Sequence, residues 1–209
     1  MRRAVLIAVW LVCGVGVRSP AEGGQVIPYG YDLHGAPIAQ LASSWTRAVV
    51  LFFLATDCPI SNRYVPEIQR LEKEFSGRGV TFWLVYPNAT ETADAVVRHE
   101  AAYGLEGATL IHQSERLMVL AAAKVTPEAG VLVPGRISPG SETLKAVYTG
   151  RIDDRYLDIG RERPKATRHD LEEAINAALA GRGVPPPGGA PVGCGIVSKA
   201  AIQSGAGKP

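Results

Sequence analysis

An unbroken apolar run, Val49 to Leu54, constrains the fold of this chain more than any other segment. It is rich in β-forming residues and has no polar alternation, which is typical of a strand covered on both faces. After Cys58-Pro59 the spacing changes, because apolar residues from Tyr64 to Phe75 recur at three- and four-residue intervals with charged residues between them. The chain therefore passes from a central strand into an amphipathic helix, which we expect to end at Gly77.

The alternation of strand and helix continues along the chain. Further strands are expected at residues 80–85, 108–111, 130–133 and 144–149, and further helices at 92–103, 114–123 and 169–179. Helices that can cover both sides of a sheet predict a three-layer α/β domain. Part of the sheet should be antiparallel, because the Pro-, Gly- and Ser-rich stretch between residues 133 and 144 is too short to hold a crossover helix.

The first residues predict export. Arg2 and Arg3 precede an uncharged apolar run from Ala4 to Val17, and Ala21 follows shortly after. A short positive region, an apolar region and a small residue at the cut site are the parts of a secretory signal peptide, and the run is shorter than the ~20 residues that span a bilayer. We expect a periplasmic or extracellular protein without stable membrane insertion after cleavage; the alternative is an uncleaved anchor.

Composition excludes several classes of protein. The 46% hydrophobic and 20% charged residues are typical of folded soluble domains rather than disordered chains. A net charge of +2 gives no electrostatic footprint for nucleic acid, which we do not expect as a partner. The four histidines are scattered without metal-ligand spacing, so no metal site is expected.

Three parts of the chain are expected from these patterns. Residues 1–21 are the signal peptide, residues 22–180 the α/β domain, and residues 181–209 an irregular Gly/Pro-rich C-terminal tail. The tail has few large apolar residues, and we expect it to be pressed onto the domain or partly disordered.

Cys58 is the residue best placed for chemistry. It falls at the N-cap of the predicted helix, and Pro59 suits the first helical position. Free N–H groups and the positive end of the helix dipole favour a thiolate there. The neighbouring Asp57 would oppose ionisation if its carboxylate pointed inward. The alternative is that Cys58 is an inert, buried apolar residue.

From about residue 25 to 180 the sequence resembles the redoxin branch of the thioredoxin-fold superfamily, which contains the alkyl hydroperoxide reductase and thiol-specific antioxidant group and secreted thioredoxin-like reductases. The resemblance rests on the lead-in at residues 31–37, the strand before Thr56-Asp57-Cys58-Pro59, and the pair Thr126-Pro127 ahead of the strand at 130–133. Segments 148–154 and 192–196 also resemble stretches of exported bacterial redoxin-domain proteins. The resemblance implies a thioredoxin-like mixed sheet flanked by helices, with Pro127 as a cis-proline beside the reactive sulfur.

Two departures from the family patterns bear on the reaction. Ser61 stands where thioredoxin-like reductases carry the second cysteine of Cys-x-x-Cys, so dithiol exchange within that motif is impossible. The peroxiredoxin pattern is also incomplete, because Thr56 lies two residues before Cys58 rather than three. Cys194 is a candidate resolving thiol that would condense with an oxidised Cys58. A structural disulfide is equally compatible with the sequence, and a free Cys194 is a third alternative.

These observations predict an exported thiol-dependent oxidoreductase in which Cys58 attacks a peroxide or a disulfide, with Cys194 as its candidate resolving residue. The expected partner is a thiol reductant protein or a small thiol, and no cofactor is implied. The short polar side chains of Thr56, Ser61 and Thr126 are expected near the sulfur. The alternative is a non-catalytic redoxin module that acts as a thiol chaperone or metalloprotein assembly factor. The charged residues at 151–155 are expected to form a solvated turn.

Overall fold

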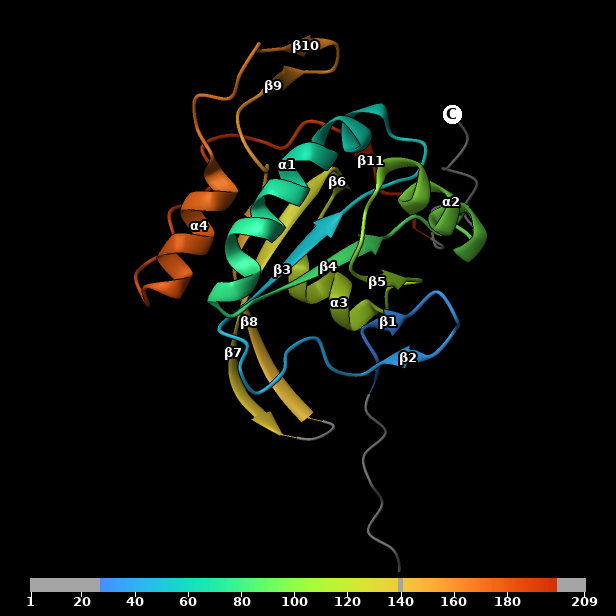
Figure 1. Ribbon diagram of the computed structural model, residues 1–209, viewed down its shortest axis with the longest axis vertical. Coiled ribbons are helices and arrows are strands. Elements are labelled where there is room, and N and C mark those ends of the chain that lie inside the picture. The colour runs from blue at the N-terminus through green and yellow to red at the C-terminus, as the bar shows by residue number, and fades with distance from the viewer. Residues whose placement is uncertain (1–26, 139–140, 199–209) are drawn as a thin grey trace, which may run out of the picture.

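A mixed sheet of seven strands forms the centre of the computed structural model, which describes residues 27–138 and 141–198 (Figure 1). The strand order is β2-β1-β5-β4-β3-β7-β8, and the bounds are β1 Gly30–Tyr31, β2 Pro37–Ile38, β3 Ala48–Phe53, β4 Val80–Tyr86, β5 Ala108–Ile111, β7 Glu128–Ser138 and β8 Ser141–Gly150. Strand β3 is parallel to β4, and β4 is parallel to β5. Strand β7 is antiparallel to both β3 and β8. The expected mixture of parallel and antiparallel pairing is confirmed.

Helices cover both faces of this sheet. They are α1 Pro59–Phe75, α2 Ala93–Tyr103, α3 Glu115–Ala121 and α4 Asp170–Leu179, and the short 3-10 helix η1 Ser76–Arg78 follows α1. Buried side chains of α1, α2 and α4 form one apolar cluster against the sheet, and α3 packs with the lead-in residues Tyr29 and Leu41 on the other face. The predicted three-layer α/β architecture is therefore confirmed, with α1 ending two residues before the expected Gly77.

The central strand explains the apolar run that dominates the sequence. Val50, Phe52 and Leu54 belong to one apolar cluster, and Val49, Leu51 and Phe53 belong to the other. Successive side chains of a strand point to opposite faces, so both faces of β3 lie under a helical layer. A polar side chain at any of these positions would lose its water without gaining a partner.

The antiparallel hairpin of β7 and β8 is longer than the predicted strands at 130–133 and 144–149. It continues through Pro134 and Gly135, which are residue types that usually interrupt a strand. The pairing shifts register between Pro134 and Ile137, and this irregularity accommodates the two residues at the end of the sheet away from Cys58.

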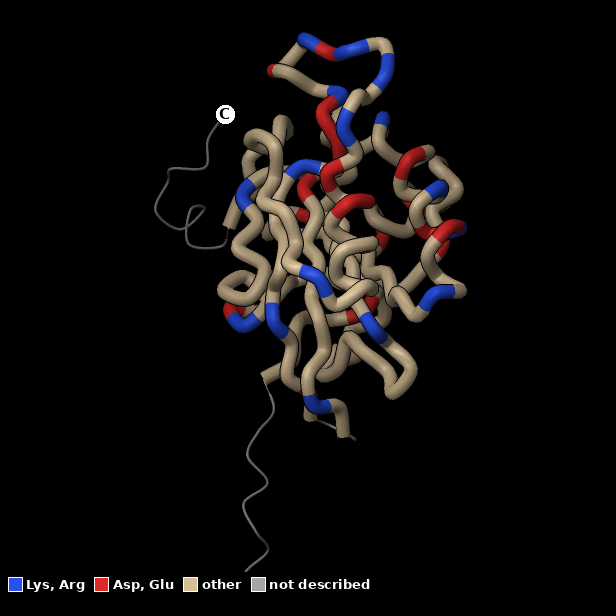
Figure 2. The backbone as a smooth tube through the Cα atoms, turned by 90° about the vertical axis from the view of Figure 1, so that its left-hand side faces the viewer, with Lys and Arg blue, Asp and Glu red and all other residues tan. Residues whose placement is uncertain are grey.

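The stretch after β8 is not the solvated turn that its charges predicted. Asp153 and Asp154 are each only 5% exposed. Asp154 accepts hydrogen bonds from the amides of Thr167 and Arg168, so protein donors replace water around its carboxylate. The next residues form a projecting hairpin of β9 Tyr156–Asp158 and β10 Arg161–Glu162, which carries charges of both signs (Figures 1 and 2).

The C-terminal tail is pressed onto the domain as far as residue 198. The Gly188 amide donates to buried Asp170, and the Val197 amide donates to the side chain of Asn88. Between these anchors the two-residue strand β11 Cys194–Gly195 pairs antiparallel with β6 Val125–Thr126. The tail thus reaches the amino-terminal end of α1 (Figure 1).

Residues 1–26, 139–140 and 199–209 are not described. The predicted signal peptide at 1–21 and the end of the tail fall within them, so the proposed boundaries of these parts remain predictions. Among the helices in the described residues, none is long and apolar enough to span a bilayer.

Candidate active site

Cys58 lies where β3 gives way to α1, as the sequence predicts. It is the N-cap residue of α1, and Pro59 occupies the first helical turn. Its side chain is completely buried, at 0% exposure. The Sγ atom donates a hydrogen bond of 3.0 Å to the carbonyl oxygen of Thr126. The Cys58 side chain makes no capping hydrogen bond to the amides of the first helical turn, which have no partners within the helix.

Cys194 reaches the same place from the tail. Strand β11 aligns Cys194 with Thr126 of β6, and its Sγ lies 2.6 Å from the Sγ of Cys58. Both cysteines are free thiols in this structure, and Cys194 is the donor of the hydrogen bond between them. An S–S bond is about 2.05 Å long, so only a small movement separates the contact from a disulfide.

Gly193 permits this approach. A Cβ atom at position 193 would lie 2.2 Å from the carbonyl oxygen of Thr126 and 2.7 Å from its carbonyl carbon. Both are backbone atoms that cannot rotate out of the way. The absence of a side chain at Gly193 therefore lets the tail lie close enough to β6 for Cys194 to contact Cys58.

The two thiols have opposite tendencies to ionise. Burial raises the pKa of Cys58, but the hydrogen bonds that its thiolate can accept from the Cys194 thiol and amide and from the Ser61 amide and hydroxyl outweigh the burial and lower the pKa overall. Burial and the neighbouring Cys58 sulfur raise the pKa of Cys194 to about 12. Asp57 is exposed and its charge adds to the rise at Cys194. The geometry thus favours a thiolate at Cys58 and a protonated thiol at Cys194.

The other predicted site residues are placed unequally around the sulfur. Ser61 is 1% exposed, and its hydroxyl makes no hydrogen bond in the neutral state, so it remains available to a thiolate at Cys58. Thr126 contacts Cys58 through its carbonyl oxygen, while its hydroxyl donates to the carbonyl of Cys194 at 3.4 Å. The structure does not bring the Thr56 hydroxyl to the sulfur: the Thr56 amide and hydroxyl both donate to buried Glu91, each at 2.9 Å.

The peptide bond between Thr126 and Pro127 is cis, as the resemblance implied. This bond lies directly before β7 and opposite the amino-terminal end of α1. The central strands of the sheet have the order β4-β3-β7-β8. The chain has a thioredoxin fold.

Comparison with solved structures finds chains that share this fold over most of their length. An uncharacterized conserved protein from Geobacillus kaustophilus is 21% identical, with a TM-score of 0.64 over 82% of this chain and 88% of that one. A hypothetical protein from Sinorhizobium meliloti 1021 is 21% identical, with a TM-score of 0.62 over 81% and 90%. Neither a scan of protein families nor a search of curated proteins finds a match.

A secreted Mycobacterium tuberculosis disulfide oxidoreductase, described as homologous to E. coli DsbE, is more distant. It is 18% identical, with a TM-score of 0.44 over 75% of this chain and 96% of that one. A likeness this low transfers no activity, so the chemistry of the thioredoxin-fold chain must be argued from its own residues.

A pocket of about 310 Å³ lies beside the thiol pair, and few of its lining residues could be predicted from the sequence. Cys194 and Gly193 form one wall, the first turns of α1 form another, and the β9–β10 hairpin forms the third; its lining residues are Pro59, Ile60, Arg63, Tyr156, Ile159, Gly160, Gly193 and Cys194. Helical spacing would have linked Arg63 with Pro59 and Ile60, because residues three and four apart share a face. Nothing in the sequence would have indicated Tyr156 or Ile159.

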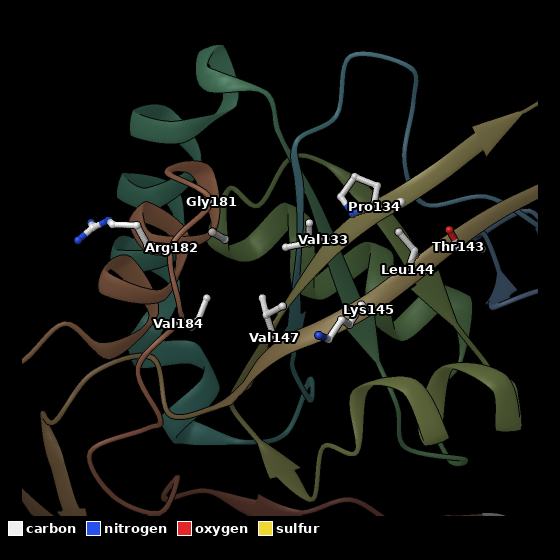
Figure 3. A pocket seen from close by; sticks show the side chains of 11 residues that line it. Val133, Pro134, Thr143, Leu144, Lys145, Val147, Gly181, Arg182 and Val184 are labelled. Carbon is white, nitrogen blue, oxygen red and sulfur yellow. The ribbon is translucent and has the colours of Figure 1, made fainter.

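Two other features lie apart from the thiols. The hollow of about 420 Å³ in Figure 3 lies between the β7–β8 hairpin and the end of α4, and Lys145 and Arg182 are the charged residues in its lining.

Glu67, Asp153 and His169 bring potential metal ligands within 4.8 Å of one another, but Glu67 already pairs with Arg70 at 2.7 Å. That no metal is required remains a prediction.

Proposed function

We propose that the protein is an exported thiol–disulfide oxidoreductase whose redox pair is Cys58 and Cys194. The observation that supports this most directly is the 2.6 Å contact between the two sulfurs. The opposite pKa shifts of the two thiols add to it, because exchange proceeds through a thiolate and the lowered pKa favours one at Cys58 rather than at Cys194. The signal-peptide pattern of residues 1–21 supports export to a compartment where disulfides persist.

The placement of Cys194 supports a redox pair without a Cys-x-x-Cys motif. Ser61 occupies the position of the missing thiol, and its unpartnered hydroxyl is available to donate to a thiolate at Cys58. The tail supplies the second sulfur instead, held at its position by the pairing of β11 with β6. When the thiolate of Cys58 and the thiol of Cys194 are oxidised, their sulfurs form one bond, and two electrons and one proton pass to the acceptor.

The peroxide reaction is a narrower alternative within the same chemistry. Cys58 would attack the peroxide, become a sulfenic acid, and then lose water as Cys194 condenses with it. Because Cys58 is 0% exposed, a peroxide would reach it only after the tail moves. The geometry therefore favours disulfide exchange over direct peroxide reduction.

The test is redox titration of the full chain in a Cys13→Ser background, so that only Cys58 and Cys194 can pair. Equilibration in glutathione buffers of increasing oxidation, followed by alkylation and intact mass measurement, should show an intramolecular Cys58–Cys194 bond that forms and reverses. The Cys58→Ser and Cys194→Ser variants should fail to cycle insulin or another protein disulfide. A pair that stays as free thiols, or a disulfide that resists mild reductant, would overturn the proposal. Hydrogen peroxide in place of oxidised glutathione separates the two substrates.

A further inference from the structure

The two sulfurs of the redox pair differ in their access to the surroundings. Cys58 is fully buried and does not line the neighbouring pocket, whereas Cys194 is partly exposed and forms part of its wall. In the closed arrangement an external thiol that enters the pocket meets the sulfur of Cys194. It cannot meet the sulfur of Cys58 without displacing the tail.

The pocket also has a defined chemical character. Its lining is mostly apolar and includes Pro59, Ile60, Tyr156 and Ile159. The charged residue in the lining is Arg63, which forms an ion pair with Glu162 at 2.6 Å. Ile159 is 75% exposed, and Leu157, two residues earlier, is 46% exposed. Both belong to the β9–β10 hairpin, which projects beyond the domain (Figure 1). Glutathione has two carboxylates and no apolar side chain, so it would leave this lining unused.

We infer that exchange with partners takes place at Cys194, and that the partner is a polypeptide thiol or disulfide with an apolar side chain next to its cysteine, which occupies this pocket. The inference rests on the proposed redox pair and names its exchange point and substrate class. A group bonded to Cys194 can extend into the pocket, because Cys194 is one of its lining residues.

The electron balance follows from this geometry. A partner thiolate attacks the Sγ of Cys194 in the oxidised pair, the Cys194–Cys58 bond breaks, and its electron pair stays on Cys58. A second thiol of the partner then attacks the partner's own sulfur, and Cys194 leaves and takes up a proton. The partner ends as a disulfide and the pair ends reduced. The lowered pKa of Cys58 makes it the better leaving group of the two, since thiols of lower pKa leave faster.

The first experiment locates the mixed disulfide. The oxidised full chain in the Cys13→Ser background is mixed with a reduced synthetic peptide, Gly-Leu-Cys-Ala, quenched with acid, digested and analysed by mass spectrometry. The peptide should be found on Cys194. Attachment to Cys58 in a protein that still cycles its disulfide would overturn the inference and leave the proposed function intact. If no Cys58–Cys194 bond forms at all, the proposed function itself has failed.

The second experiment tests the pocket. Reduction of the pair by Gly-Leu-Cys-Ala should be about tenfold faster than by Gly-Ser-Cys-Ala, as expected when one apolar side chain is partly buried. Ile159→Asp should remove this preference. Val119→Asp is the matched control, because Val119 is also 75% exposed but lies on α3, outside the pocket lining. Equal rates for the two peptides with the wild-type chain would contradict the inference whether or not the variants fold.

Discussion

Substitution of Gly193 by alanine should separate the two sulfurs without touching either one. The new Cβ would lie 2.2 Å from the Thr126 carbonyl oxygen and 3.1 Å from the Pro127 nitrogen, and ordinary contacts require about 1 Å more at the oxygen. The tail must therefore retreat and take Cys194 with it. A misplacement of about 1 Å can cost about a hundredfold in the reactivity of paired groups. We expect the effective concentration of Cys194 at Cys58 to fall ten- to a hundredfold, which is about 1.4–2.8 kcal/mol.

The assay is the equilibrium of the Cys58–Cys194 bond against glutathione redox buffers, with trapping by alkylation. Gly195→Ala is the matched control, because it adds the same methyl group on the other side of Cys194 with nothing within 4 Å. Gly193→Ala should also speed alkylation of Cys58, since the displaced tail no longer covers the Cys58 sulfur. If Gly193→Ala and Gly195→Ala give equal equilibria within about twofold, the close approach of β11 to β6 does not control the redox pair.

Three further changes test the electrostatics and burial of the domain. Ser61→Ala removes a donor to the Cys58 thiolate, so the pKa of Cys58 should rise and its alkylation at neutral pH should slow; an unchanged pH profile would contradict the role of Ser61. Asp57→Asn should lower the pKa of Cys194, read from the pH dependence of Cys194 alkylation in a Cys58→Ser background. Burial raises the pKa of Glu72 to about 7, so the folded state holds its proton more tightly than the unfolded state and stability falls as pH rises from about 4.5 through 7. Urea unfolding should show Glu72→Gln to be about 1–3 kcal/mol more stable than wild type near pH 8 and indistinguishable near pH 4; equal stability at both values would contradict this.

The half of the site carried by Cys58 could be predicted because its signals are local. These signals are close together in the sequence: the apolar residues of β3, then the proline after Cys58, then the helical spacing that follows it. Such local signals determine where a strand ends and a helix begins. The cis Thr126–Pro127 bond was placed only through the resemblance, because the residues around Pro127 do not by themselves specify a cis bond.

Cys194 could be named from the sequence as a candidate partner of Cys58, but its position beside that sulfur could not be predicted, for a physical reason. Strand β11 has two residues in a Gly/Pro-rich tail, which is too short for any hydrophobic periodicity to show. Its position depends on pairing with Val125 and Thr126, and the two cysteines are 136 residues apart. The hairpin that lines the pocket was missed similarly, because the buried carboxylates of Asp153 and Asp154 resemble surface charges until their partners are known.

Moving the second thiol from the helix to the tail separates two tasks that a Cys-x-x-Cys motif combines. In this chain Ser61 favours the thiolate, and Gly193 lets Cys194 reach it. Ser61→Ala should therefore act mainly on the pKa of Cys58, while Gly193→Ala should act mainly on the disulfide equilibrium. The separation is incomplete, because the Cys194 thiol also donates to Cys58 and lowers its pKa. A double-mutant cycle of Ser61→Ala and Gly193→Ala should therefore be fully additive in the disulfide equilibrium only if this donation is unimportant. A coupling free energy above about 0.5 kcal/mol would measure how much the tail itself stabilises the thiolate.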